Sequence, residues 1–187
     1  MKFLSLRDGL AHDVSLDEAE SFYDRHVRGR ARIGSDITAM DDALTVTGTV
    51  VCLLRNQSGQ LLDARMGPNL VTTEGLGWRV DRMQSLTGTP TLPDYQGIGT
   101  GTTAANIADT ALQTEIGTRT QGTLSQPTAT TDRLVTVFAA GNGTGAITET
   151  GRLTASSGGT LVARQVFSAI NKGASDSLTI THDFTVS

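Results

Sequence analysis

The histidines, the cysteine and the carboxylate-rich stretches are the residues of this chain that could carry catalysis or metal binding. His12, His26 and His182 are scattered, and none belongs to an H-E-x-x-H or comparable ligand spacing. Cys52 is the only cysteine, so one chain can build neither a disulfide nor a cysteine-based zinc site. His182 falls on the apolar side of a β pattern, and we expect it to pack in the core or at a subunit contact.

Two glycine-rich stretches, 97–101 and 141–145, have the composition of phosphate-binding loops. Neither contains Gly-Lys-Ser/Thr or opens a helix after a buried parallel strand, so we interpret both as turns. The densest carboxylates, Asp17, Glu18 and Glu20, fall in the first turn of a predicted helix, where the helix dipole favours negative charge. We therefore predict no catalytic residue, metal ligand or cofactor site, and expect the protein not to be an enzyme.

The elements that would position these residues are mainly strands, because threonine and glycine dominate the composition. The 187 residues include 29 Thr and 21 Gly but only eight aromatic residues. Threonine suits pleated strands and glycine suits tight turns, which excludes an all-helical bundle. From Thr87 onward lie 23 of the 29 threonines, whereas residues 1–85 hold 22 of the 34 charged side chains. The chain therefore divides into a charged N-terminal part and a Thr-rich β part.

Net charge and hydropathy exclude two classes of partner. A formal charge of -4 argues against a general nucleic-acid binder, which needs a basic excess. No window approaches the roughly 20 apolar residues of a membrane span. The apolar opening is interrupted by Arg7 and Asp8 and is too short for a secretory leader, so we expect the chain to stay in the compartment of its synthesis.

Two helices are predicted in the first half of the chain. Ser15 and Glu18 form a capping box at the start of residues 15–28, which carry an apolar stripe and end at Gly29. The second helix begins with Thr73 as N-cap, and its apolar residues Leu76, Val80 and Met83 recur at helical spacing.

Strand patterns account for most of the remaining chain. Residues 44–55 and 60–65 predict a hairpin around the 56–59 turn, and shorter patterns follow at 95–101, 133–140, 145–153 and 160–170. The last strand alternates strictly, with Leu178, Ile180, His182, Phe184 and Val186 on one face. These patterns predict an antiparallel β-sandwich, jelly-roll-like, of about seven or eight strands over residues 44–187, preceded by a helical or extended arm at 1–43.

Five residues are candidates for partner binding. Four arginines, Arg25, Arg28, Arg30 and Arg32, lie within eight residues at the junction between arm and sandwich, where they could dock on an acidic surface. Trp78 is the only tryptophan, and its type suits both a core and an interface.

Six blocks of sequence resemble, in the same order, a family of small structural proteins of tailed bacteriophages and prophages. The blocks span about 120 residues and begin with Asn69–Gly75, Gln96–Ala104 and Asp109–Glu115. They continue with Gly145–Gly151, Gly158–Arg164 and the segment from Val166 to Gly173. Residues 1–68 show no such match.

This resemblance implies a role in virion assembly. The leading expectation is a capsid decoration or cement protein that binds the major capsid protein and is made in the cytoplasm of the bacterial host. By analogy with such proteins we expect a homotrimer. A neck, collar or tail component, possibly a fibre base, is the alternative. A glycan-binding module or glycan hydrolase is a third reading, weakened by the scarcity of aromatic residues and of paired carboxylates.

Overall fold

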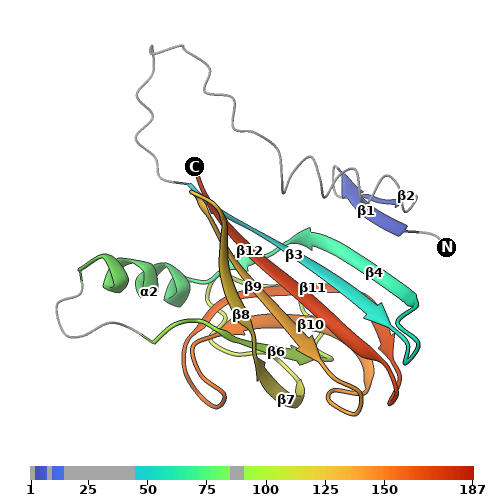
Figure 1. The fold of residues 1–187 in the computed structure, drawn as a ribbon. Helices are drawn as coiled ribbons and strands as arrows, with labels where there is room; N and C mark the ends of the chain where they lie inside the picture. Colours follow the sequence, from blue (N-terminus) through green and yellow to red (C-terminus); the bar gives the residue numbers. More distant parts are fainter. Residues whose placement is uncertain (1–2, 8–9, 15–44, 85–90) are drawn as a thin grey trace.

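The computed structural model describes residues 3–7, 10–14, 45–84 and 91–187. The predicted helix at 15–28 and the four arginines from Arg25 to Arg32 lie outside these residues. The described part is mainly β, with two sheets facing each other and one helix, α2 (Thr73–Gln84), at one end (Figure 1). The predicted β-sandwich is therefore confirmed.

The larger sheet has the strand order β2-β1-β4-β3-β12-β9-β8. Its five body strands are antiparallel and comprise β3 (Val46–Arg55), β4 (Leu61–Pro68), β8 (Thr123–Thr128), β9 (Thr131–Phe138) and β12 (Ser177–Val186). A hairpin of β1 (Phe3–Arg7) and β2 (Leu10–Val14) joins the edge, with Leu4 of β1 paired in parallel with Arg65.

The smaller sheet is antiparallel throughout and has the order β5-β11-β10-β6-β7. Its strands are β5 (Leu70–Val71), β6 (Tyr95–Gly99), β7 (Glu115–Gln121), β10 (Gly145–Leu153) and β11 (Leu161–Lys172). The described chain from residue 45 onward thus contains ten strands, rather than the seven or eight predicted. The pair β7 and β8 was missed because both strands are mostly exposed and lack apolar alternation.

The core lies between the sheets and draws on both. It contains Val50, Cys52, Leu54, Ile98, Phe138, Ile147, Ile170, Leu178 and Ile180, all at most 3% exposed. The alternation predicted for β12 is confirmed, since Leu178, Ile180, His182 and Phe184 are all buried on one face. These residues pack without a large aromatic cluster, as expected from the composition.

The turn at 141–145 connects β9 to β10 and carries the chain from one sheet to the other. The side chain of Asn142 accepts from the Thr118 N–H at 2.8 Å and donates to the Thr118 carbonyl at 2.9 Å. Gly117, at φ 67°, lies in the irregular stretch of β7 where pairing with β6 is interrupted. Asn142 therefore satisfies the main-chain groups that this interruption leaves unpaired.

Candidate functional site

Helix α2 begins at a threonine that also fixes the helix to the sheet. The Thr72 hydroxyl accepts from the Gly75 N–H at 3.0 Å and donates to the Leu161 carbonyl. This geometry makes Thr72 the N-cap and corrects the assignment of Thr73, which is one residue too late. The Thr73 N–H instead donates to the Ile107 carbonyl at 2.8 Å.

The inner side of α2 packs closely on β11. A Cβ placed on Gly75 would lie 2.1 Å from the Val162 carbonyl oxygen, so only glycine permits this approach. Trp78 is half-buried against the cluster of Val162, Ala163 and Phe184, and its indole N–H donates to the Thr91 carbonyl at 2.8 Å. Trp78 therefore anchors the helix to the body; a role in binding a partner stays a prediction.

Two arginines, one from α2 and one from β10, lie over the Phe184 ring. The guanidinium carbons of Arg79 and Arg152 lie 4.5 and 4.9 Å from the ring centroid. Arg152 is fully buried, donates to the Pro93 carbonyl at 2.6 Å and forms a 2.9 Å ion pair with Asp132 of β9. Because Arg152 lies on β10, this ion pair joins the two sheets.

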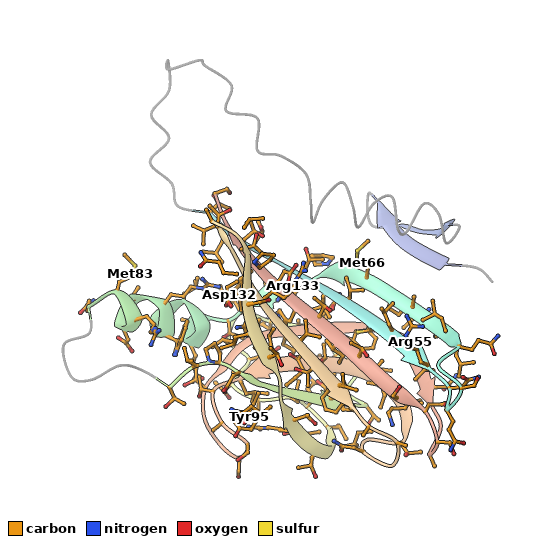
Figure 2. All side chains as sticks on the ribbon, viewed as in Figure 1. Arg55, Met66, Met83, Tyr95, Asp132 and Arg133 are labelled. Carbon is orange, nitrogen blue, oxygen red and sulfur yellow. The ribbon has the colours of Figure 1, made fainter. Side chains whose placement is uncertain are left out.

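The outer side of α2 exposes apolar side chains. Leu76, Val80 and Met83 are 41%, 49% and 80% exposed, and Met83 points away from the sheets at the far end of the helix (Figure 2). The helical spacing predicted for these residues is confirmed, yet the stripe that they form faces outward. Exposed apolar side chains grouped on one helix face are typical of an interaction surface.

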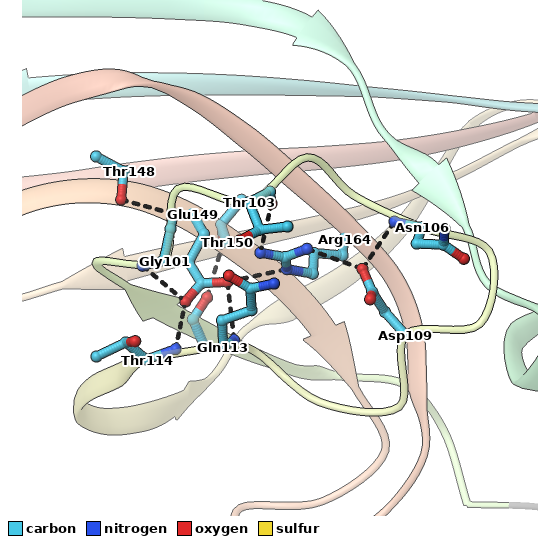
Figure 3. A network of polar contacts seen from close by, with 11 residues as sticks. Gly101, Thr103, Asn106, Asp109, Gln113, Thr114, Thr148, Glu149, Thr150 and Arg164 are labelled. Carbon is cyan, nitrogen blue, oxygen red and sulfur yellow. Dashed lines mark hydrogen bonds and ion pairs between the residues drawn. The ribbon is translucent and has the colours of Figure 1, made fainter.

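A second feature, a buried carboxylate, lies in the smaller sheet. Glu149 of β10 is fully buried, and its oxygens accept from the N–H groups of Gly101, Gln113 and Thr114 at 3.0, 3.1 and 2.8 Å (Figure 3). The Nε of Arg164 adds a fourth bond at 2.9 Å. Burial acts to raise the pKa of Glu149, but these four donors outweigh it and hold the pKa below its ordinary value.

The glycine-rich stretch 97–101 makes room for that carboxylate. A Cβ on either Gly99 or Gly101 would lie 2.5 Å from Glu149 Oε1. The interpretation as a turn is therefore incomplete, because the stretch is partly β6 and partly an anion cradle. The anion is the chain's own Glu149, bound by main-chain N–H groups in the way that such loops bind phosphate.

Arg164 extends the network to the loop between β6 and β7. Its guanidinium donates to Asp109 at 2.8 Å and to the Thr103 carbonyl at 3.1 Å, while Asp109 accepts from the Asn106 N–H. Glu149 and Arg164 thus hold both ends and the middle of residues 100–114 against the sheet. No buried side-chain nitrogen or oxygen of Glu149 or Arg164 lacks a hydrogen-bond partner, so this network can hold the loop in place.

Of the two places expected for His182, the core and a subunit contact, the structure shows the core. The ring is fully buried within the chain, contacts the Asn69 amide and lies 4.9 Å from the Phe184 centroid. Desolvation, helped by the nearby charges of Arg152 and Arg79, holds its pKa well below the ordinary value. Full burial inside one chain places His182 away from any subunit contact.

The described residues contain no group of three or more His, Cys, Asp or Glu side chains that could hold a metal ion. In the same part of the chain, no helix is long and apolar enough to cross a membrane. A groove of about 500 Å³ runs beside α2, lined on the helix side by Glu74, Trp78 and Asp81 and opposite by Thr91 and Thr160.

The structurally decisive charged residues, Glu149, Arg152 and Arg164, were not singled out from the sequence. The scarcity of charged residues in this part of the chain could have drawn attention to them. Only 12 charged residues occur from Leu86 onward, and these three interrupt strand patterns. Glu149 and Arg164 also fall within two of the six blocks of sequence quoted above, Gly145–Gly151 and Gly158–Arg164. Residues from four of the six blocks therefore meet in one buried network (Figure 3).

The chain matches no protein-family model, no curated protein and no solved structure.

Proposed function

We propose that this chain is a non-enzymatic structural protein of a tailed-bacteriophage virion, most simply a capsid decoration protein that binds the major capsid shell and associates with copies of itself. The observation that carries the proposal is the outward apolar stripe on α2, which gives the sandwich a surface for assembly. The six blocks of sequence resemblance supply the virion context. The protein would be made in the host cytoplasm and end in the particle.

The interior charges support a non-catalytic role. Glu149 is bound by four donors, Arg164 pairs with Glu149 and Asp109, and Arg152 pairs with Asp132. A catalytic carboxylate or base needs a free lone pair or proton directed at a substrate. The lone pairs and protons of these interior groups are instead engaged in contacts that hold a loop, two sheets and a helix together.

The proposed anchor on the shell is the arm at 1–43, through Arg25, Arg28, Arg30 and Arg32. Arginines pair well with carboxylates on an acidic partner surface. Virions produced with the protein lacking residues 1–43 should lose most of it, whereas full occupancy by the truncated protein would contradict this role. Replacing the four arginines by glutamine in the full chain separates their charge from the length of the arm.

Copy number tests the location in the particle. Quantitative gel analysis of purified virions should find hundreds of copies for a decoration protein. A number between about 3 and 18, the range set by ring symmetries, would favour the neck, collar or tail alternative. A definite hit in a glycan-binding screen would support the third reading, for which the groove beside Trp78 is the place to look.

A further inference from the structure

We propose that the arm packs on the outer face of its own sandwich. The arm segment, residues 15–28, carries the predicted apolar stripe of Leu16, Ala19, Phe22, Tyr23 and Val27. This stripe would lie, in helical form, against two uncharged rows of side chains on the larger sheet. The inference goes beyond the proposed function and does not depend on the particle in which the protein is found.

Two rows of side chains cross the outer face of the larger sheet. In β3 the core residues alternate with Val51 and Leu53, which therefore point away from the smaller sheet. The pairing of β4, β3, β12 and β9 extends each of these two residues into a row of four. The first row is Met66, Val51, Thr181 and Val135, and the second is Ala64, Leu53, Thr179 and Val137. Neither row contains a charged side chain, whereas the outer face of an antiparallel sheet is commonly polar.

The rows form an apolar area with a charged border. Val137 is 52% exposed, and Met66 projects from β4 on the side away from the smaller sheet (Figure 2). Beside the first row lies the ion pair of Arg133 with Asp183, at 2.6 Å, which bounds the area on one side. A contiguous apolar area with a polar rim is typical of an interaction surface.

The N-terminal hairpin sets the place where the arm segment starts. β2 ends at Val14, which pairs with Phe3 of β1, and the next residue of β1, Leu4, pairs with Arg65 of β4. Arg65 immediately precedes Met66, the β4 residue of the first row. The arm segment therefore begins at the sheet edge from which both rows run.

The chain that follows the arm segment is long enough to return to the sandwich. Residues 29–44 connect the segment to Thr45, which directly precedes β3. Val51 lies six residues farther along the strand, a distance of about 20 Å. The connection of 16 residues can span about 50 Å when extended, so the segment can reach the rows of its own chain.

The stripe matches the rows in length. Leu16 and Val27 are 11 residues apart, which is about 16 Å along a helix, and a row across four strands spans about 14 Å. Arg25 follows Leu16 by nine residues, or two and a half helical turns, so it would point away from the sheet. The same spacing separates Arg28 from Ala19. Docking therefore leaves both arginines directed outward, where the proposed function needs them.

Hydrogen exchange of the full-length protein, read by mass spectrometry on peptides from the arm segment, tests this contact. The wild type should protect the arm segment. Phe22→Glu in the stripe and Val137→Glu in the second row should each speed exchange of the segment at least about tenfold. Circular dichroism should show that both variants keep the folded sandwich.

Each variant has a matched control. Ser21→Glu adds the same charge on the opposite side of the predicted helix, and Val80→Glu replaces a valine of similar exposure, 49%, on α2. Both controls should leave exchange of the arm segment within about twofold of wild type. The inference is wrong if the wild-type segment exchanges as fast as an unstructured peptide, if Val137→Glu leaves its exchange unchanged, or if Val80→Glu speeds it as strongly.

A thiol at position 179 gives an independent reading from the sheet. Thr179→Cys introduces a reactive group in the second row, and Cys52 does not compete for the reagent because it is buried. Labelling of the new thiol should become at least about tenfold faster when Phe22→Glu is added. Unchanged labelling would show that the arm segment does not cover the rows. Protection that is lost on dilution would place the segment on a neighbouring copy and overturn the intrachain contact.

Discussion

Glu149 holds a negative charge inside the sandwich only because four N–H donors surround it. Replacing it by glutamine keeps the shape but turns an NH₂ group toward some of those donors and leaves Arg164 without its fully buried charge partner. We expect Glu149→Gln to lower the free energy of unfolding by about 3–5 kcal/mol, as measured by denaturant titration. Glu115→Gln, which breaks a partly exposed pair with Arg119, should cost no more than about 1 kcal/mol.

Because the pKa of Glu149 is lowered in the folded protein, the charge stabilises the fold at pH values above the pKa of the unfolded state, near 4.5. That contribution should disappear as pH falls through the lower, folded pKa. Wild-type stability should therefore fall below pH 4.5 more steeply than that of Glu149→Gln. Parallel curves for the two proteins would contradict this linkage.

His182 also makes the stability of the fold depend on pH, but in a higher pH range and because the unfolded chain takes up a proton. The folded ring stays neutral because its pKa lies well below 6.5, while the unfolded chain takes up a proton near pH 6.5. Stability should thus decrease as pH falls below 6.5, with a slope of up to about 1.4 kcal/mol per pH unit. His182→Phe should remove this slope between pH 6.5 and 5, measured by thermal unfolding at several pH values; an unchanged slope would assign it to another group.

The reactivity of the Cys52 thiol can report how fast the folded structure opens. Burial in the core raises the pKa of its thiol to about 12, so almost no thiolate exists near neutral pH and the sulfur is inaccessible. A thiol reagent should label the native protein only at the rate at which the structure opens, and should label the protein at once in denaturant. Rapid labelling of the native state would show that β3 opens locally.

At the scale of the helix, two glycines separated by one residue should behave in opposite ways. Gly75→Ala brings a methyl group into the Val162 carbonyl and should destabilise the protein by at least about 2 kcal/mol. Gly77→Ala meets open space and should stabilise the helix by about 0.5–1 kcal/mol. Both changes can be read from the free energy of unfolding, measured by denaturant titration.

Elements with one apolar face were predictable, and the remaining elements were not. The alternation of β12 follows from its place between two strands with one face on the core, so its sequence records its burial. β7 and β8 are edge strands whose residues mostly face solvent, and Thr or Gln at such positions fits a strand as well as a loop.

The buried network was unpredictable for a different reason. Glu149 and Arg164 are 15 residues apart and meet only because β10 and β11 pair with Gly151 opposite Arg164. Pairing register and the path of a 15-residue loop are tertiary properties that no local pattern in the chain encodes. The apolar stripe of α2 illustrates another limit of sequence patterns. Its spacing predicted the helix, but spacing alone could not show which face of the helix would be covered.

For the whole molecule, the strand order predicts a graded resistance to opening. β12 and β10 each lie between two hydrogen-bonded neighbours and contribute to the central core, whereas β8 and β7 lie at sheet edges. Hydrogen exchange followed by mass spectrometry should show the slowest exchange in β12 and β10, and exchange at least about tenfold faster in β8. Uniform protection of all strands would mean that the sandwich opens only as one unit.

Most contacts around Glu149 are made by main-chain groups, and this determines what the protein can display. Residues 100–114 are held by the N–H groups of Gly101, Gln113 and Thr114 and by the Thr103 carbonyl, with Asp109 as the only ionic side-chain tether. Hydrogen bonds to the peptide backbone do not depend on which side chains the loop carries. Exposed positions such as Ala104 and Ala111 are therefore suited to grafted epitopes or affinity peptides, displayed on a loop whose path the sandwich dictates.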